Sequence, residues 1–186
     1  MAINLETPLG LEDLLELKAG YEASLNGTIF TARDAAHARL MKLIKEGKNL
    51  PFDIEGQIIY YVGPTPAQPG KVIGSAGPTT SYRMDRYTPQ LLKRGLRGVI
   101  GKGKRSDDVR QAFSTFQAIY FIAVGGAGAL LSSHITAAEV VAYPELGPEA
   151  IYKLVVKDFP VLVGYDCWGG DIYEQGKNAY RRDERT

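Results

Sequence analysis

The sequence predicts a single α/β domain with strand-rich ends and a helical middle. Between residues 88 and 125, segments with a helical spacing of apolar residues alternate with short apolar runs typical of strands. The chain has 186 residues, of which 45% are hydrophobic and 23% charged, so it can bury one sizeable core and is too short for two ordinary domains. We therefore treat residues 1–186 as one domain.

The first elements are expected between residues 22 and 47. "EASLNGTIF" (22–30) reads as two strands around an Asn26-Gly27 turn, because Asn-Gly is a strong hairpin signal. "TARDAAHARLMKLIKEG" (31–47) predicts a helix with Thr31 as its N-cap and Gly47 as its end. The apolar residues that share one face of this helix are Ala36, Leu40, Leu43 and Ile44.

The middle of the chain predicts strands and helices in alternation. "QIIYYVG" (57–63) and "KVIGS" (71–75) are rich in strand formers and read as paired strands on either side of a Pro/Gly loop. Thr88-Pro89 begins a short helix that Gly95 ends. A strand over 96–101, a helix over 106–117 and a fully buried strand over 118–125 follow. "GGAGAL" (125–130) fits a tight strand-to-helix turn better than a dinucleotide site, because it lacks the spacing of that motif.

The last third of the chain predicts three strands and a loose end. The strands are "EVVAY" (139–143), "AIYKLVV" (150–156) and "VLVGYD" (161–166), separated by breaks that contain proline. Residues from about 177 to 186 are charged and are expected to form a loose tail.

Charge and composition limit the possible partners. The formal net charge is +1, from 22 Lys and Arg against 21 Asp and Glu, so no global field attracts nucleic acid or an anionic membrane. No run approaches the length of a membrane span, and the N-terminus lacks the pattern of a signal peptide, which favours a cytoplasmic protein. A single cysteine, Cys167, and two histidines are too few for an iron-sulfur cluster or a zinc site held by this chain alone.

Three cations stand out by their local context. Arg33 lies in the first turn of its predicted helix, where the helix dipole disfavours a cation, so it either meets an anion or is balanced by Asp34 at the surface. Arg83 and Lys102 each follow a turn punctuated by glycine, "GPTTSYR" and "VIGKGKR", and such turns present backbone N–H groups beside a cation. His37, one turn beyond Arg33, is more typical of a packing histidine than of a catalyst.

These residues resemble half of an active site. "GKGK" lacks the spacing of a phosphate-binding loop, and no Ser-His-Asp or Cys-His set can be proposed. What remains is a group of cations and hydroxyls suited to a small polyanion but without a strong base, metal or cofactor site. Its members are Arg33, Thr79, Thr80, Arg83 and Lys102.

Four separated segments resemble one known family. "GTIFTARDAAH", "GPTTSYRMD", "VIGKG" and "YKLVVKDFPVLV" occur in the order found in the β subunit, or C-terminal domain, of class I fumarases and L-tartrate dehydratases, over roughly Leu5 to Tyr173. The resemblance implies a swivelling β/β/α domain with mixed sheets and a helical layer. It also implies a hetero-oligomer with an α subunit, which holds a four-iron four-sulfur cluster on three cysteines.

The resemblance gives each candidate residue a role. Arg33, Arg83 and Lys102, with Thr80, are implied to bind the carboxylates of a C4 dicarboxylate, and Thr79 to take part in proton transfer. The implied reaction is the reversible hydration of fumarate to L-malate, with tartrate dehydration or a module that binds anions without chemistry as alternatives. Two departures from the family are the bulky Tyr82, which bears on pocket size, and "DCWGGD" (166–171), which we interpret as structural.

Overall fold

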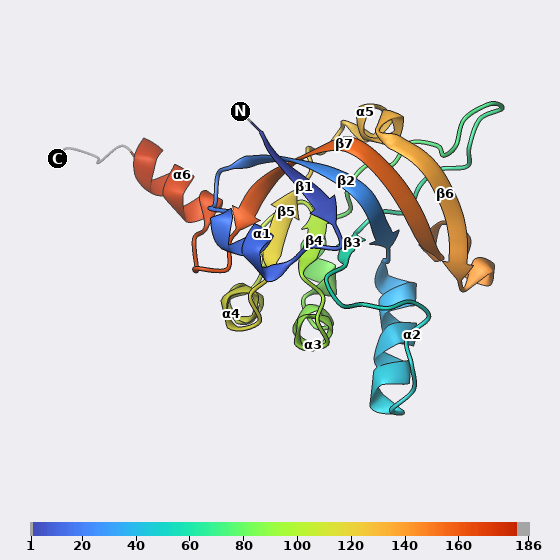
Figure 1. Ribbon diagram of the computed structural model, residues 1–186, viewed down its shortest axis with the longest axis horizontal. Coiled ribbons are helices and arrows are strands. Elements are labelled where there is room, and N and C mark those ends of the chain that lie inside the picture. The colour runs from blue at the N-terminus through green and yellow to red at the C-terminus, as the bar shows by residue number, and fades with distance from the viewer. Residues whose placement is uncertain (1, 182–186) are drawn as a thin grey trace.

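The computed structural model describes residues 2–181 as one mixed sheet with helices around it (Figure 1). Its strands are β1 (Ile3–Thr7), β2 (Glu22–Thr31), β3 (Ile58–Tyr60), β4 (Gly98–Gly101), β5 (Ile119–Ile122), β6 (Ile135–Ala142) and β7 (Ile151–Tyr165). Its α-helices are α1 (Leu11–Glu16), α2 (Asp34–Lys45), α3 (Thr88–Lys93), α4 (Asp107–Thr115), α5 (Gly128–Ser133) and α6 (Ile172–Tyr180). Two 3-10 helices are η1 (Ser81–Met84) and η2 (Pro144–Glu149).

The sheet closes on itself through its longest strand. The strand order is β1-β2-β3-β4-β5-β7-β6, and β2 also pairs with β7, so β2, β3, β4, β5 and β7 form a ring. Strands β2 to β5 run parallel to one another, whereas β7 is antiparallel to both β2 and β5. The carboxyl ends of β2, β3, β4 and β5 therefore lie at the same edge of the ring.

Alternating side chains of the central strands fill two separate cores. Ile58 and Tyr60 of β3 belong to the cluster inside the ring, whereas Ile59 and the following Tyr61 belong to a second cluster with residues of α2, α3 and α4. Figure 1 shows these three helices together on one side of the ring. The period-two alternation of the strands thus gives the sheet one apolar face toward the inside of the ring and another toward a layer of helices. The predicted α/β class, with a mixed sheet and a helical layer, is confirmed.

The hairpin predicted over 22–30 is wrong. Residues Glu22–Thr31 form one continuous strand, with a bulge between Leu25 and Gly27 and a φ of +98° at Gly27. β1 pairs with one edge of this segment and β7 with the other, so both edges are occupied and the chain has no reason to reverse. The Asn-Gly pair, which commonly marks a turn, here forms a bulge.

The strand predicted over 71–75 is also wrong. This segment belongs to the loop between β3 and η1, and it does not pair with β3. β3 already has β2 on one edge and β4 on the other, so no edge is available for a local partner. Residues 71–75 are rich in strand-forming types, but composition cannot reveal that the partners of β3 come from distant parts of the chain.

The end of the chain contains two strands where three were predicted. β7 runs unbroken through Pro160, which lies opposite Ser24 of β2. On the other edge of β7, β6 pairs with residues 151–156 and β5 with 162–165, so Pro160 lies between these two partners. A proline is tolerated there because no strand on that side needs its missing N–H group.

The three helices predicted over 31–47, 88–95 and 106–117 are present as α2, α3 and α4. α3, α4 and the neighbouring strands β4 and β5 lie within their predicted segments, and Gly47 and Gly95 follow α2 and α3 with φ values of +67° and +98°. Thr31, however, is not the N-cap of α2. It ends β2, and its buried hydroxyl donates a hydrogen bond to the Ala150 carbonyl oxygen.

The C-terminal segment begins as a helix. Residues 177–180, which were expected in a loose tail, form the end of α6. The Asp171 carboxylate caps this helix by accepting hydrogen bonds from the N–H groups of Tyr173 (2.8 Å) and Glu174 (3.2 Å). The rest of the expected tail, residues 182–186, lies outside the described residues.

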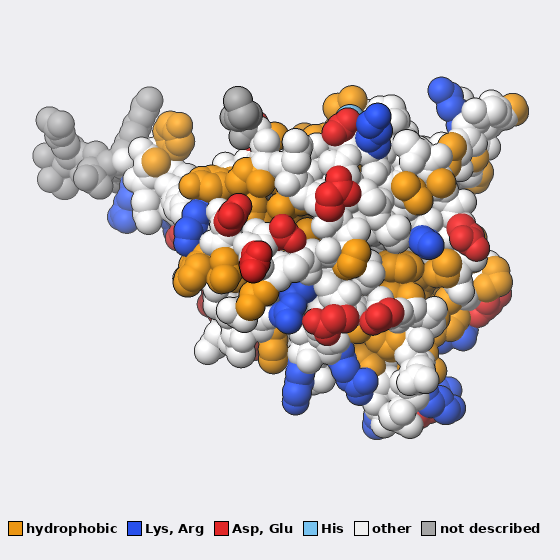
Figure 2. All heavy atoms as spheres, in the orientation of Figure 1, with side chains coloured by type: hydrophobic (Ala, Val, Ile, Leu, Met, Phe, Trp, Pro, Cys, Tyr) orange, Lys and Arg blue, Asp and Glu red, His pale blue; other side chains and the backbone are white. Residues whose placement is uncertain are grey.

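The surface carries charges of both signs. On the face seen in Figure 2, acidic and basic side chains are interspersed, in agreement with a formal net charge of +1. Among residues 2–181 no helix combines the length and apolar character needed to cross a membrane.

Candidate functional site

The predicted site residues gather where the parallel strands end. Arg33 follows β2, Gly63 follows β3, Lys102 directly follows β4 and Gly125 follows β5. The loop 77–85 lies along the same edge, because the Thr79 N–H donates a 2.7 Å hydrogen bond to the Tyr61 carbonyl oxygen. In α/β folds, whether the sheet is open or closed, the carboxyl ends of parallel strands are the usual place for a ligand.

Arg33 is held between two segments of the edge. It is the N-cap residue of α2, and its Nη2 lies 3.5 Å from Glu149 Oε1 of η2. The guanidinium also lies against Gly63, where an added Cβ would come within 2.5 Å of Arg33 Nη1. Only glycine therefore fits at residue 63 while Arg33 holds this position. Arg33 Nε is buried without a hydrogen-bond partner among the described residues.

Thr80 and Lys102 are paired through their backbones. They form an isolated parallel bridge, and the next N–H group, that of Ser81, donates to the Lys102 carbonyl oxygen at 3.0 Å. The Lys102 side chain runs beside Gly125, where an added Cβ would lie 3.8 Å from Nζ. Among residues 2–181 Lys102 has no ion-pair partner, so its charge is available to an anion.

Residues 79–85 of "GPTTSYRMD" divide into buried anchors and outward groups. Ser81 and Met84 are fully buried, and Asp85 is nearly so, whereas Thr79 is half-buried and Thr80, Tyr82 and Arg83 are exposed. Ser81 Oγ accepts hydrogen bonds from the Lys102 N–H and the Tyr120 hydroxyl, both at 3.0 Å. Gly101 leaves the space that this hydroxyl fills. The anchors fix the loop, and the outward groups are left for a ligand.

Arg83 connects the loop to the start of α2. Its Nη2 lies 3.2 Å from Asp34 Oδ2, and its side chain is 46% exposed. A hollow of about 760 Å³ borders this pair and is also lined by Tyr82 and Arg86. Arg33 and Arg83 thus lie at the same end of α2, although no direct contact joins them.

Arg105 and Asp85 form a buried ion pair beside this loop, and neither residue stood out in the sequence. Arg105 Nε donates to Asp85 Oδ1 at 2.6 Å beneath η1, and the Arg105 side chain is 0% exposed. In the sequence, Arg105 ends the run "GKGKR", which looks like ordinary surface charge. The one available signal is Asp85 at the end of "SYRMD". Its charged neighbours in sequence are arginines, so it could have been expected to pair with one.

His37 is a buried packing residue. Its ring lies between those of Tyr61 and Tyr87, and its Nδ1 lies 2.8 Å from the Arg33 carbonyl oxygen, to which it donates as the neutral ring. Burial lowers the pKa of His37 from 6.5 to about 4, so the ring is uncharged at neutral pH. His37 is thus buried, stacked and hydrogen-bonded, as expected of a packing histidine.

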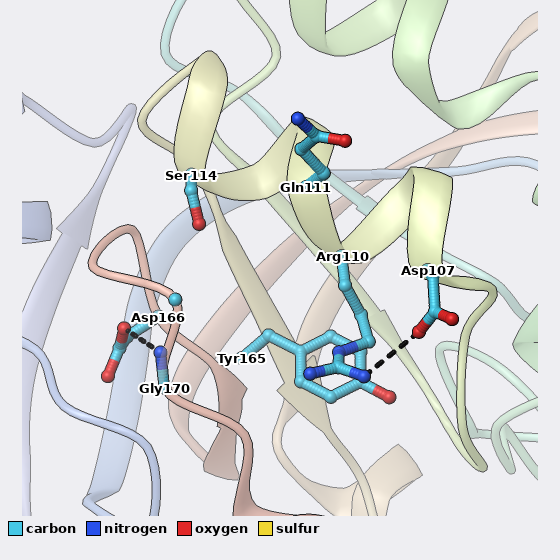
Figure 3. A pocket seen from close by; sticks show the side chains of 8 residues that line it. Asp107, Arg110, Gln111, Ser114, Tyr165, Asp166 and Gly170 are labelled. Carbon is cyan, nitrogen blue, oxygen red and sulfur yellow. Dashed lines mark hydrogen bonds and ion pairs between the residues drawn. The ribbon is translucent and has the colours of Figure 1, made fainter.

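The turn 166–171 is built around one aspartate. Asp166 accepts hydrogen bonds from the N–H groups of Ala19, Trp168 and Gly170, at 2.8, 2.9 and 2.8 Å. A hollow of about 250 Å³ separates this turn from α4, with Arg110 on its wall (Figure 3). Arg110 is paired with Asp107 at 3.0 Å and Asp171 at 3.1 Å, so its charge is already balanced. These contacts agree with a structural role for "DCWGGD".

The described residues do not fit an iron-sulfur cluster. Among residues 2–181 no group of three or more His, Cys, Asp and Glu side chains is placed to hold a metal ion. Cys167 is buried, and its Sγ donates to the Leu14 carbonyl oxygen at 3.4 Å. Burial raises the pKa of this thiol, which disfavours the thiolate form that a metal requires.

Comparison with known proteins identifies the family. The Fumarase C-terminus family matches residues 1–176. The chain is 40% identical over 177 residues to "Fumarate hydratase class I, aerobic" of Salmonella typhimurium and 42% identical over 167 residues to "Fumarate hydratase class I, anaerobic" of Escherichia coli. These alignments cover 93% and 89% of the chain but only 30% of each relative.

A relative of similar length also matches. The chain is 36% identical over 178 residues to the protein named "Putative L(+)-tartrate dehydratase subunit beta" of Methanocaldococcus jannaschii, and the alignment covers 92% of the chain and 91% of that protein. By the family match over residues 1–176 and by these identities, the chain belongs to the Fumarase C-terminus family.

Proposed function

We propose that this chain is the β-type half of a hydro-lyase that interconverts fumarate and L-malate. The observation that carries the proposal is the common edge at which β2, β3, β4 and β5 end, with Arg33 and Lys102 on it and the loop of Thr79 and Arg83 bound along it. A C4 dicarboxylate is small, polar and doubly negative. It therefore needs cations from more than one segment, which this edge provides.

In this proposal Arg33, Arg83 and Lys102 bind the two carboxylates, and Thr80 adds a hydroxyl. Two of the three cations already have a carboxylate neighbour, since Glu149 lies beside Arg33 and Asp34 beside Arg83. These neighbours orient the guanidinium groups, while Lys102 contributes the uncompensated charge. The positive charge favours a transition state in which negative charge grows on the substrate carboxylate next to the reacting carbon.

Thr79 is the proposed proton-transfer residue of this chain. Its backbone N–H is bound at 2.7 Å to the carbonyl oxygen of Tyr61, the residue after β3, which holds residue 79 at the edge. A free threonine hydroxyl is too weak a base at neutral pH to act alone. The proposal therefore includes an assisting base or a proton relay, supplied by an α-type partner.

The partner also supplies the cofactor in this proposal. The described residues lack the ligands for an iron-sulfur cluster, so we propose that a four-iron four-sulfur cluster belongs to an α-type region with which this chain forms a hetero-oligomer. The proposed location is the cytoplasm. Cytoplasmic proteins rarely contain disulfides, and the free, buried Cys167 agrees with that.

L-tartrate is the second candidate substrate. The observation in its favour is that the M. jannaschii relative matches this chain over 91% of its own length, whereas each class I fumarate hydratase is matched over 30%. Tartrate carries one more hydroxyl than malate. The exposed Tyr82 beside Arg83 is the residue we expect to distinguish the two, because it borders the same hollow.

Reconstitution tests the proposed function. The chain is assayed alone, and then together with the cluster-loaded α-type region, without oxygen, on fumarate, L-malate and L-tartrate. We expect no turnover by the chain alone and turnover by the pair. Activity of the chain alone contradicts the divided site, and a loaded pair that is inactive on all three substrates favours a module that binds anions without chemistry.

A further inference from the structure

A buried ion pair lies directly beneath the loop that carries Thr79 and Arg83. Arg105 donates from Nε to Asp85 Oδ1 and from Nη2 to Thr88 Oγ1, each at 2.6 Å. The N–H group of Arg105 donates to the Tyr165 hydroxyl at 3.0 Å. One side chain therefore contacts the end of η1 and the start of α3, while its backbone is bound to β7.

Asp85 joins two of the three segments that carry the proposed substrate cations, those of Arg83 and Lys102. Its Oδ1 binds Arg105, and its Oδ2 accepts from the Ser106 N–H at 2.6 Å. Arg83 lies two residues before Asp85, and Lys102 three residues before Arg105. The carboxylate therefore fixes the distance between the loop of Arg83 and the segment that follows Lys102.

Aromatic rings enclose the Arg105 side chain of this pair. The rings of Tyr61, Phe113 and Tyr120 surround the guanidinium, with centroids 5.4, 5.8 and 5.2 Å from Cζ. Nη1 is buried and has no hydrogen-bond partner among the described residues. Well-packed apolar residues are often as stable as a buried ion pair or more so, because they avoid the cost of desolvating two charges. The benefit of a charged pair is instead a fixed direction for the groups bound to it.

We propose that Arg105 is a positioning residue that acts through Asp85 to hold η1, and with it Arg83, in the geometry that binds the substrate carboxylate. This inference rests on the proposed function and deepens it. Arg105 itself does not touch the substrate, since its side chain is fully buried. Its replacement is expected to weaken substrate binding more than the chemical step.

The first test measures the loop without any assay of activity. Hydrogen exchange is followed in the full chain at the N–H groups of Asp85 and Tyr87, which bond to the carbonyl oxygens of Tyr82 at 3.1 Å and Met84 at 2.9 Å. Arg105→Lys keeps the charge but loses the planar fork that binds Asp85 and Thr88 together. We expect at least about tenfold faster exchange at both amides in Arg105→Lys, and no change there in Arg110→Lys, the matched control on α4.

The second test separates positioning from folding. Arg105→Lys and the double variant Arg105→Met with Asp85→Asn are assayed with the α-type region after their melting temperatures are compared with wild type. We expect KM to rise about tenfold or more and kcat to change less than about threefold, even where the melting temperature is unchanged. Arg105→Ala is expected to regain a KM close to that of wild type when guanidinium is added at concentrations far below those that unfold the protein.

Different failures have different meanings. If the wild-type pair is inactive, the proposed function fails, and the exchange test still decides whether Arg105 holds η1. If exchange at Asp85 and Tyr87 in Arg105→Lys equals that in Arg110→Lys, the positioning role is contradicted. An active pair in which Arg105→Lys and the double variant both keep the wild-type KM also contradicts it.

Discussion

Glu149 holds Arg33 and the first turn of α2 with its two carboxylate oxygens. Oε1 lies 3.5 Å from Arg33 Nη2, and Oε2 accepts the Ala35 N–H at 2.8 Å. The sequence left open whether Asp34 balances Arg33, but the ion-pair partner of Asp34 is Arg83. A cation is therefore tolerated at the positive end of a helix because an acid from η2 satisfies both the cation and the helix terminus.

Replacing Glu149 with glutamine is predicted to affect stability and binding together. The amide oxygen can still accept the Ala35 N–H, but the charge beside Arg33 is lost. We expect the free energy of unfolding to fall by about 1 kcal/mol, because the pair is only partly buried. We also expect KM to rise, since Arg33 loses its orientation. Urea unfolding and steady-state kinetics of the reconstituted pair measure the two effects. An unchanged KM argues against Glu149 as an orienting residue.

Thr79→Val is predicted to slow the chemical step and spare binding. Valine nearly keeps the shape of threonine and leaves the backbone hydrogen bond to Tyr61 intact, while the hydroxyl is removed. We expect kcat to fall about a hundredfold or more with KM within about threefold of wild type, the size of effect typical of proton-transfer groups. Thr136→Val, on exposed β6, is the control. Equal kcat values for the two variants exclude Thr79 from proton transfer.

His37 is predicted to make the chain sensitive to acid. Its pKa is lowered from 6.5 to about 4 by burial, so above pH 6.5 the ring is neutral in both folded and unfolded states and costs nothing. As the pH falls from 6.5 to 4, the unfolded state takes up a proton that the folded state does not, and stability is lost. The loss of unfolding free energy from this proton approaches about 3 kcal/mol. It does not increase further once the pH is below the pKa of His37 in the folded state.

A comparison of two variants isolates the contribution of His37. His37→Gln cannot take up this proton, so its free energy of unfolding should depend less on pH than that of wild type between pH 6.5 and 4. Urea unfolding of both proteins at several pH values measures the difference. Parallel pH profiles show that His37 does not carry the acid sensitivity.

Elements whose signals lie within a short segment, such as apolar spacing or the residues at a helix end, were predicted well from the sequence. α3 and α4 follow from apolar spacing and from the residues at their ends, and β5 follows from its unbroken apolar run. The failures at residues 22–30 and 71–75 have the opposite cause. β2 and β3 pair with strands far away in the chain, and which edges are occupied cannot be read from a short segment.

The sequence indicated the outward residues of this edge but not the buried pair that supports them. Arg83 and Lys102 stand beside turns with glycine, and the structure brings their segments together through the bridge of Thr80 and Lys102. Their roles in binding remain predictions. Arg105 escaped notice because burial of a charge depends on tertiary packing, and nothing in "GKGKR" distinguishes a buried arginine from a solvated one.

The central claim is that "GPTTSYRMD" presents Arg83 to a substrate carboxylate, and Arg83→Ala tests it most directly. The control is Lys48→Ala, because Lys48 is 64% exposed and pairs only with Glu46 at 2.8 Å among the described residues. The measurement is kcat/KM of the reconstituted pair on fumarate, L-malate and L-tartrate. We predict a loss of several kcal/mol, about a hundredfold or more, for Arg83→Ala and almost none for Lys48→Ala. Equal kcat/KM values for the two variants on every substrate that the wild-type pair turns over contradict the claim, and the stretch is then an ordinary turn.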